Sequence, residues 1–368
     1  MAEKAATMQA VVFKQPYEVA FEQVPRPTDP QAGEAIVRVK ACGLCGSDLH
    51  PYRGAEKGLH PGTVCGHEFA GVVEEVGAGV KLDPGARVAA SFTTACGNCW
   101  FCKHSLSSRC EDAKLFGWIN EETGDGIHGA QAQFVRVPNA DSTLVVLPPD
   151  VSFEDGVLVG DIFATGYFCA SNALSALTGS GVPNSELTAV VVGCGPVGLC
   201  AIAGAKSLGF GHVYAIDRVE SRLKKAQDLG ATPIYPDQDP LAVIREATLS
   251  TNGGYGADAV LEVVGAYGAL EISFQLVRPG GVVSSVGVHA HDKGFPVSPE
   301  QCYDKNVTFR SGRCPARSLM PELCHTVGKS GISQIISHRV PLSRASEMYK
   351  QFESQADGIL KVIFDPWA

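Results

Sequence analysis

The chain has no basic stripe, although the short segment 308–315 is rich in arginine. Among its 368 residues, 30 are Lys or Arg and 39 are Asp or Glu, which gives a net charge of -9 at pH 7. A protein that binds nucleic acid or an anionic membrane surface needs a patch of clustered positive charge. The composition therefore argues against both kinds of partner.

Long uninterrupted hydrophobic runs are also missing. The longest apolar stretch, 189–205, is interrupted by Gly193, Gly195, Pro196 and Gly198. It is therefore typical of a strand, a turn and a helix rather than of a membrane span. The first nine residues contain no apolar segment of the length found in a secretory signal peptide. We expect a cytoplasmic protein without a membrane segment.

An even, regularly spaced set of cysteines is absent too. The chain has 13 cysteines, whereas a secreted disulfide scaffold is usually shorter and evenly paired. Reduced cysteines that bind metal fit better. Four of them share one loop with the spacing C-x2-C-x2-C-x7-C, which predicts a closed, structural zinc site rather than a chance run of buried or oxidised thiols. These four are Cys96, Cys99, Cys102 and Cys110.

The pattern of elements divides the chain into two domains of α/β class. Up to about residue 150, short β-rich runs alternate with Gly and Pro turns, which predicts a compact antiparallel, barrel-like domain. Later in the chain strands and helices alternate, which predicts a doubly wound parallel sheet. We expect the first domain at 1–162, the nucleotide-binding domain at 163–311, and a return to the first domain at 312–368.

The expected elements of the second domain follow from this alternation. Strands are predicted at 188–192, 213–216, near 234, and at 259–263, 282–286 and 307–309. Helices are predicted at 165–176, 197–208, 220–229, 241–249 and 266–276. In the returning segment we expect a helix at 345–353 and a strand at 360–364.

A glycine-rich turn predicts the nucleotide site. The run from Gly193 to Gly198 follows an apolar strand and opens a helix. The first glycine permits a tight turn, the second lets a pyrophosphate approach the backbone, and the third lets helix and strand pack closely. A bend without a ligand can look the same, so the motif gains weight from its place between strand and helix. The predicted contacts are Gly193, Gly195, Pro196, Val197 and Gly198.

Asp217 ends the next predicted strand and bears on the choice of cofactor. A carboxylate there accepts hydrogen bonds from the ribose hydroxyls and repels a 2′-phosphate, so NAD is predicted in preference to NADP. Arg218 weakens this preference, because a guanidinium can bind the extra phosphate. The alternative is that Asp217 only caps the following helix.

A second metal site is predicted upstream of the four-cysteine loop. Cys45 and His67-Glu68 lie in glycine-rich turns, and this ligand set suits a zinc ion with one open position. A single histidine is more often a hydrogen-bonded core residue than a ligand. The combination of the turn at 42–48 with the turn at 66–68 favours the metal site.

The motifs together resemble those of the zinc-containing medium-chain dehydrogenase/reductase family, the alcohol dehydrogenase superfamily. They are C-G-S-D-x-H at 45–50, G-H-E at 66–68, the four-cysteine loop, D-x-x-x-T-G at 161–166 and the dinucleotide turn. The resemblance covers essentially the whole chain. It implies a GroES-like, β-rich catalytic domain followed by a Rossmann domain.

The resemblance also implies the ligands of the catalytic zinc, which are Cys45, His67 and Asp161. Glu68 would lie close by, either as an exchangeable ligand or as a residue that supports the ligands without binding the metal, and the chain would hold two zinc ions. Aspartate at 161 is a feature of glutathione-independent formaldehyde dehydrogenases, whereas liver-type alcohol dehydrogenases carry cysteine there. We therefore expect a member of the formaldehyde dehydrogenase-like group. Asp48 is expected to hydrogen-bond His67 and fix its tautomer.

The reaction implied by the resemblance is hydride transfer between NAD and a small alcohol, an aldehyde hydrate or an adduct. Ser47 and His50 would pass the proton to solvent through the nicotinamide ribose. Further cofactor contacts implied in the same way are Thr165, Arg222 and Lys361.

Two other functions are alternatives to a small-alcohol dehydrogenase. One is a polyol or amino-alcohol dehydrogenase similar to sorbitol or threonine dehydrogenases. The other, a non-catalytic zinc- and nucleotide-binding protein, is disfavoured because all three implied ligands are present. The short segment at 110–131 favours, by resemblance, a homotetramer over a dimer, and the lack of a long cofactor-covering insertion implies exchangeable NAD.

Overall fold

The computed structural model describes residues 6–289, 293–356 and 358–368, which fall into two compact units. The first unit runs to Asp161 and also takes 315–329 and 336–368. The second unit takes 162–314 and 330–335. The expected boundaries after 162 and 311 lie close to these breaks. Residues 330–335, which were expected in the returning segment of the first domain, belong to the second unit instead.

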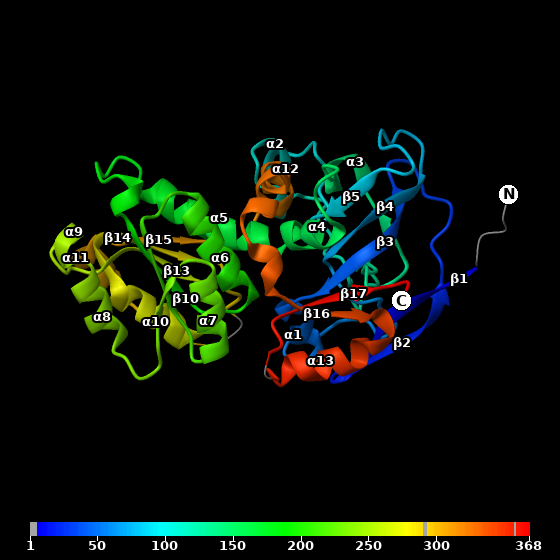
Figure 1. The fold of residues 1–368 in the computed structure, drawn as a ribbon. Helices are drawn as coiled ribbons and strands as arrows, with labels where there is room; N and C mark the ends of the chain where they lie inside the picture. The colour runs from blue at the N-terminus through cyan, green and yellow to red at the C-terminus, as the bar shows by residue number, and fades with distance from the viewer. Residues whose placement is uncertain (1–5, 290–292, 357) are drawn as a thin grey trace. The chain divides into compact units, whose positions relative to one another are not determined.

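The first unit is built on a seven-stranded sheet in the order β16-β17-β3-β4-β5-β9, with β8 paired to β3 (Figure 1). All of its pairs are antiparallel except β16 with β17. Two hairpins, β1-β2 and β6-β7, complete the strands of this unit. The strands are β1 (Thr7–Gln15), β2 (Glu18–Pro25), β3 (Ala35–Leu44), β4 (Phe69–Val76), β5 (Arg87–Ala90), β6 (Trp118–Ile119), β7 (Gly126–Ile127), β8 (Phe134–Val137), β9 (Leu144–Val146), β16 (Ile336–Pro341) and β17 (Lys361–Asp365).

The helices of the first unit are short. Their bounds are α1 (Leu49–Tyr52), α2 (Trp100–Lys103), α3 (Ala140–Thr143), α4 (Phe153–Gly160), α12 (Ala316–Thr326) and α13 (Ala345–Glu353), with 3-10 turns η1 (Gly46–Asp48), η2 (Ser107–Arg109), η4 (Val327–Lys329) and η6 (Leu342–Arg344). The prediction of α13 and of strand β17 is confirmed.

Helix α4 matters for the site because it leads directly to Asp161. Ser152 caps its N-terminus by accepting a hydrogen bond from the backbone N–H of Asp155, as short polar residues do at this position. Its apolar residues Val157, Leu158 and Val159 are buried, and the helix packs against β4 and β5. The side chain that follows the helix is therefore delivered to the sheet of the first unit.

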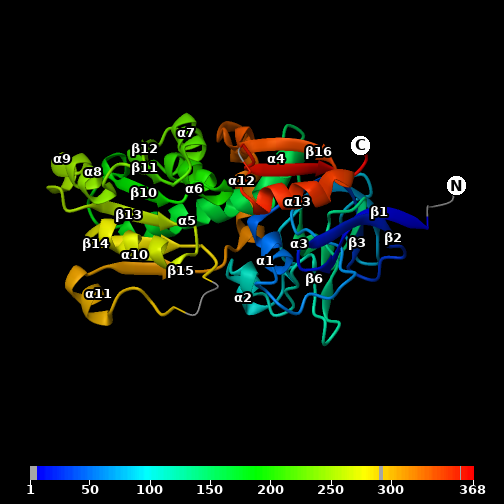
Figure 2. The same cartoon turned by 90° about the horizontal axis from the view of Figure 1, so that it is seen from below.

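The second unit contains the predicted parallel sheet. Its strands lie in the order β12-β11-β10-β13-β14-β15, and every pair is parallel (Figure 2). This order confirms the doubly wound prediction and includes the sixth strand. The strands are β10 (Thr188–Val192), β11 (His212–Ile216), β12 (Thr232–Ile234), β13 (Ala257–Glu262), β14 (Val277–Ser285) and β15 (Thr308–Ser311).

Helices connect these strands. They are α5 (Ile162–Leu177), α6 (Pro196–Ser207), α7 (Glu220–Asp228), α8 (Pro240–Ala247), α9 (Leu249–Asn252), α10 (Tyr267–Leu276) and α11 (Pro299–Lys305), with 3-10 turns η3 (Asn184–Glu186) and η5 (Ile332–Ile335). The prediction of a single helix at 241–249 was wrong at its C-terminal end. The chain breaks at buried Thr248, whose hydroxyl donates back to the carbonyl of Ile244, and a short separate helix follows.

No single helix in the described part of the chain is long and apolar enough to cross a membrane. The consecutive helices α4 and α5 reach that length and composition only when they are counted together.

Helices α5 and α6 of the second unit pack at very short distance. A Cβ built on Gly166 would lie 2.6 Å from the Cβ of Cys200 and would overlap the backbone at Cys200 and Ala201. Real Cβ atoms do not approach so closely, so only glycine fits in α5 at this point. The last residue of the D-x-x-x-T-G motif is therefore explained by helix packing.

Replacing Gly166 with alanine is expected to destabilise the protein by about 1–3 kcal/mol, because the added methyl group meets backbone atoms that cannot rotate away. Urea denaturation measures this change. Gly268 in α10 provides the matched control, since a Cβ there meets no atom within 4 Å. Gly268→Ala should leave the free energy of unfolding unchanged or slightly raised. Equal stability of the two variants would contradict the tight α5–α6 contact.

Candidate functional site

The pairing of two strands brings the first two predicted ligands together. In the antiparallel pair β3-β4, Cys42 lies opposite Phe69. Cys45 comes just after the end of β3, and His67 comes just before the start of β4. Both side chains therefore lie at the same end of the sheet. Asp161 arrives there from the C-terminal end of α4.

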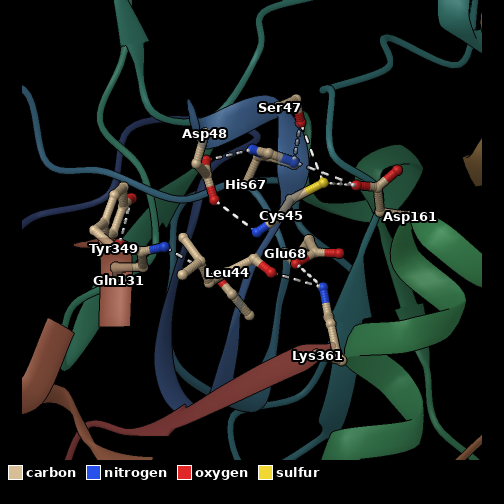
Figure 3. A network of polar contacts seen from close by, with 11 residues as sticks. Leu44, Cys45, Ser47, Asp48, His67, Glu68, Gln131, Asp161, Tyr349 and Lys361 are labelled. Carbon is tan, nitrogen blue, oxygen red and sulfur yellow. Dashed lines mark hydrogen bonds and ion pairs between the residues drawn. The ribbon is translucent and has the colours of Figure 1, made fainter. Parts of the chain in front are cut away.

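The three side chains converge on one point (Figure 3). Asp161 Oδ2 lies 3.4 Å from Cys45 Sγ and 3.2 Å from His67 Nε2. One donor atom from each residue lies within 4.8 Å of the others. A sulfur, a nitrogen and an oxygen that meet in this way are a set of donors typical of a zinc site.

Asp48 fixes the orientation of His67, as predicted. Its Oδ1 lies 3.0 Å from His67 Nδ1, and its Oδ2 accepts a hydrogen bond of 2.9 Å from the backbone N–H of Cys45. The Asp48 carboxylate therefore links the loop that carries Cys45 to the loop that carries His67. Because Nδ1 is occupied in this way, Nε2 is the ring nitrogen that faces the other donors.

The electrostatics of the site favour a positive charge among the donors. Burial disfavours the imidazolium, but Asp48 and Asp161 outweigh it and raise the pKa of His67 well above its usual value. Burial likewise disfavours the Asp161 carboxylate, but its contact with His67 lowers the pKa of that group. Burial raises the pKa of the Cys45 thiol to about 11. A metal cation held here would supply the charge that Cys45 and Asp161 require.

Glu68 and Lys361 form a fully buried ion pair below Cys45. Lys361 Nζ donates to Glu68 Oε2 and, at 3.2 Å, to the carbonyl of Leu44. Burial raises the pKa of Glu68, while the ammonium of Lys361 opposes that rise. Glu68 Oε1 is buried and has no hydrogen-bond partner among the described residues. A buried oxygen without a partner beside three donor atoms fits a metal site.

The position of Lys361 bears on its predicted role. The sequence predicts a contact with the cofactor, but the side chain is 0% exposed and its ammonium is engaged by Glu68 and Leu44. A direct contact would require the ammonium to leave this ion pair. In this structure Lys361 supports the loop that carries Cys45.

Ser47 and His50 lie on the segment that follows Cys45. The hydroxyl of Ser47 donates to Cys45 Sγ at 3.2 Å and lies 3.2 Å from His67 Nε2. It is exposed, whereas the three donor residues are buried. His50 is half-buried on α1. The structure thus places Ser47 beside the donors and His50 one helical turn further along.

The four predicted cysteines of the second site also form a cluster. The sulfur atoms of Cys96, Cys99, Cys102 and Cys110 all lie within 4.8 Å of one another. Backbone N–H groups point at them: that of Cys96 donates to Cys110 Sγ at 3.2 Å, and that of Cys99 donates to Cys96 Sγ at 3.3 Å. Backbone donors lower the pKa of Cys99 to about 6. Burial, in contrast, raises the pKa of Cys102 to about 12 and also raises the pKa of Cys110. A cation among the four sulfur atoms would favour the thiolate form, the form that binds zinc.

The glycine-rich turn has the geometry of a nucleotide site. Gly193 has φ +99°, a conformation that favours glycine, and a Cβ on Gly198 would overlap the carbonyl oxygen of Gly193. A Cβ on Gly195 would meet no atom within 4 Å, so the backbone there is open to an incoming group. Pro196 and Val197 lie in the first turn of α6, and the free backbone N–H groups at this end of the helix would face a bound phosphate.

Asp217 lies at the end of β11 and contacts this turn. Its Oδ2 accepts a 2.7 Å hydrogen bond from the backbone N–H of Cys194, and its Oδ1 accepts one of 2.9 Å from Val219. Each carboxylate oxygen retains a lone pair for a further donor. Arg218 is exposed and Arg222 is half-buried on α7. Thr165 is half-buried on α5.

Two buried residues next to the metal-site loops were missed by the sequence analysis. Gln131 and Tyr349 are hydrogen-bonded to each other, and Gln131 also bonds to Gly43. They lie far from Cys45 and His67 in the chain and belong to no motif. Only the fold brings them together.

The fold and the donor cluster define a class: a two-unit α/β protein with a Rossmann-type sheet and a buried group of Cys, His and Asp donors suited to a metal ion. Two protein-family models match the chain. The alcohol dehydrogenase GroES-like domain matches residues 31–149, and the zinc-binding dehydrogenase model matches residues 196–327.

Individual proteins agree with these matches. The chain is 44% identical over 360 residues to zinc-type alcohol dehydrogenase B of Aspergillus flavus, which covers 97% of this chain and 81% of that protein. It is 30% identical over 345 residues to the NADP-dependent isopropanol dehydrogenase of Clostridium beijerinckii, with 90% of each covered. Its structure resembles the alcohol dehydrogenase TADH from Thermus sp. ATN1, with a TM-score of 0.88, 36% identity and coverage of 97% and 99%.

The chain therefore belongs to the zinc-containing medium-chain dehydrogenase/reductase family, the alcohol dehydrogenase superfamily. This confirms the family and the fold that the motifs implied. It also makes the chain an oxidoreductase of the alcohol dehydrogenase type, and membership of this family supports zinc and a nicotinamide cofactor.

The four-cysteine loop generates a prediction about metal content. Cys99→Ser should remove about one zinc ion per chain and lower Tm, since a closed structural site needs all four thiolates. Elemental analysis and a thermal melt measure the two effects. Cys302→Ser is the control, because Cys302 is half-buried on α11 and lies outside both donor clusters. Equal zinc content in the two variants would show that this loop holds no metal.

Proposed function

We propose that the chain is a zinc-dependent dehydrogenase that transfers a hydride between a small alcohol and NAD. The convergence of Cys45, His67 and Asp161 on one point is the observation that supports this proposal most strongly. The Rossmann-type sheet with Asp217 beside the glycine-rich turn supports the choice of cofactor. The four-cysteine cluster would hold a second, structural zinc ion.

Bound by Cys45, His67 and Asp161, zinc would act as a Lewis acid that lowers the pKa of a substrate hydroxyl. Cys45 and Asp161 each contribute one negative charge, which balances the two charges of the ion. His67 contributes a neutral ring nitrogen whose direction is set by Asp48. These residues would hold the ion, and the hydride transfer itself would be the chemistry of the nicotinamide.

The proton released from the hydroxyl needs a route to solvent. Ser47 is the exposed group next to the donor atoms, with its hydroxyl 3.2 Å from both Cys45 Sγ and His67 Nε2. His50 follows on α1, one helical turn further along the chain. We propose that the Ser47 hydroxyl accepts this proton as it gives up its own, and that His50 passes a proton on to solvent.

NAD is proposed in preference to NADP on the chemistry of Asp217. A 2′-phosphate would lie against this carboxylate, whereas ribose hydroxyls can donate to its remaining lone pairs. The related Clostridium beijerinckii dehydrogenase is named for NADP, so the family accommodates both cofactors. Arg218 is the residue of this chain that could bind the extra phosphate.

The proposed substrates are small alcohols, together with aldehyde hydrates and adducts of the kind that formaldehyde dehydrogenase-like enzymes use. Aspartate at 161 supports that group. A polyol or amino-alcohol substrate is the second possibility, although no contact in the structure favours it. By resemblance we also expect a cytoplasmic homotetramer with exchangeable NAD.

The catalytic assignment predicts the effect of two substitutions. Cys45→Ala and Asp161→Ala should each reduce alcohol-dependent NADH formation by at least about 1,000-fold, since a Lewis acid contributes several kcal/mol to such a reaction. Binding of NAD, measured by calorimetry, should persist. NADH absorbance with a panel of short alcohols and formaldehyde measures turnover, and a chelator should abolish it in the unmodified protein.

Cys42→Ala is the control for these variants. Cys42 is a buried thiol near the end of β3, its Sγ lies 4.0 Å from the carbonyl oxygen of Phe364, and it does not belong to the donor cluster. This variant should keep most of the turnover. Wild-type kcat in either ligand variant would show that the assignment is wrong.

The role of Asp217 is tested by Asp217→Ala. Loss of charged hydrogen bonds to the ribose should weaken NAD binding by about 1.5–3 kcal/mol and lower the ratio of kcat/KM for NAD over NADP by about 10–100-fold. Asp239→Ala removes a carboxylate that only caps α8 and should leave the ratio unchanged. If Asp217→Ala lowers Tm but not the ratio, Asp217 is only a structural cap.

A further inference from the structure

Next to the two loops of the proposed metal site lies a buried pair of side chains, Gln131 and Tyr349, at the left of Figure 3. The hydroxyl of Tyr349 donates to Gln131 Oε1 at 3.0 Å. The amide of Gln131 in turn donates from Nε2 to the carbonyl oxygen of Gly43, also at 3.0 Å. Gln131 is 0% exposed, so water does not replace either partner.

The first loop that Gln131 contacts is the one that carries Cys45. Gly43 lies two residues before Cys45, at the end of β3. Its N–H donates to the carbonyl of Glu68 at 2.9 Å, and its carbonyl accepts from Gln131. The peptide groups that lead into Cys45 are thus held on one side by the His67-Glu68 turn and on the other by Gln131.

The second loop that Gln131 contacts is the one that carries His67. Gly66 precedes His67 and has φ +89°, and a Cβ there would lie 2.5 Å from Gln131 Cγ. The side chain of Gln131 therefore packs directly on the backbone of Gly66. The N–H of Gln131 also donates to the carbonyl of Cys65 at 2.9 Å. Gln131 thus touches the chain just before each of two proposed ligands.

Tyr349 fixes the amide of Gln131 from the side of helix α13. Gln131 Oε1 accepts a hydrogen bond from the Tyr349 hydroxyl, and this directs Gln131 Nε2 toward the carbonyl oxygen of Gly43. The ring of Tyr349 packs against that of Tyr52, with centroids 5.3 Å apart. Tyr52 belongs to α1, which follows the turn that carries Ser47. The helix of the returning segment is in this way tied to the same loop.

We propose that Gln131 is a positioning residue that sets the spacing between the Cys45 loop and the His67 loop, with Tyr349 orienting its amide. This inference rests on the proposed function, because in that proposal the two loops bind the same metal ion. Metal sites tolerate deviations of only about 0.2 Å in ligand distance. A side chain that bonds to one loop and packs on the other controls that distance, although it touches no ligand atom itself.

The test is the rate at which the protein gives up zinc to an excess of chelator, followed by a colorimetric zinc indicator well below Tm. Residues that orient metal ligands typically change metal affinity by 10–100-fold. Gln131→Met keeps the volume but removes both hydrogen bonds. Zinc release should show two phases, a faster one from the Cys45 site and a slower one from the four-cysteine cluster. We expect Gln131→Met to speed the faster phase at least about tenfold and to leave the slower phase unchanged.

Gln133→Met is the matched control. Gln133 lies two residues away and also bonds to backbone at both ends of its amide, to Gln9 and Pro366, but not to the metal-site loops. Its zinc release should equal that of the unmodified protein. Tyr349→Phe removes only the hydroxyl that donates to Gln131. This smaller change keeps the proposal testable if Gln131→Met does not fold. It should speed release from the Cys45 site in the same direction, by a smaller factor.

The outcomes separate the two proposals. If the unmodified protein holds zinc at the Cys45 site and Gln131→Met and Tyr349→Phe release it no faster than Gln133→Met, the positioning role is wrong and the proposed function stands. If Gln131→Met accelerates both phases alike, Gln131 acts only on general stability, which also overturns the role. If the unmodified protein holds zinc only in the four-cysteine cluster, the proposed function itself fails.

Discussion

The antiparallel pairing of β3 with β4 is the constraint on which the proposed active site depends. With Cys42 opposite Phe69, the residues that follow one strand and precede the other come together at one end of the sheet. Cys45 and His67 lie in these two positions, although they are well separated in the chain. Helix α4 then packs on β4 and β5 and delivers Asp161 to the same place. A slip in this register would move the sulfur and the imidazole apart, and no local interaction could bring them back.

Charge imposes the second constraint. The end of the sheet buries the acidic groups of Asp48, Glu68 and Asp161 together with the thiol of Cys45, and Lys361 and His67 face them from within the same unit. Buried charges are costly unless they are paired or coordinate a metal. The raised pKa of His67 shows that this environment stabilises a positive charge among the donors. A divalent cation in contact with a thiolate and a carboxylate would meet the same demand, as the proposed metal site requires.

Much of this arrangement could be predicted from the sequence, for identifiable physical reasons. Strand and helix alternation fixes a parallel sheet, and the glycine pattern at 193–198 requires a backbone that only a tight strand-to-helix turn provides. Cysteine spacing indicated the four-sulfur cluster, and the expected Asp48–His67 contact is present. The break at Thr248 and the assignment of 330–335 to the second unit depend on tertiary packing. Gln131, Tyr349 and the ion pair of Lys361 with Glu68 join distant segments through single side chains, and no sequence period marks such contacts.

Anomalous X-ray scattering at the zinc absorption edge, measured on crystals of the protein grown with zinc, tests the central claim most directly. We predict one peak in contact with Cys45 Sγ, His67 Nε2 and a carboxylate oxygen of Asp161, at about 2.3 Å from the sulfur and about 2.0–2.2 Å from the nitrogen and the oxygen. A second peak is expected within the four-cysteine cluster. A map with density only in that cluster, and with Cys45, His67 and Asp161 bonded solely to one another, would contradict the account.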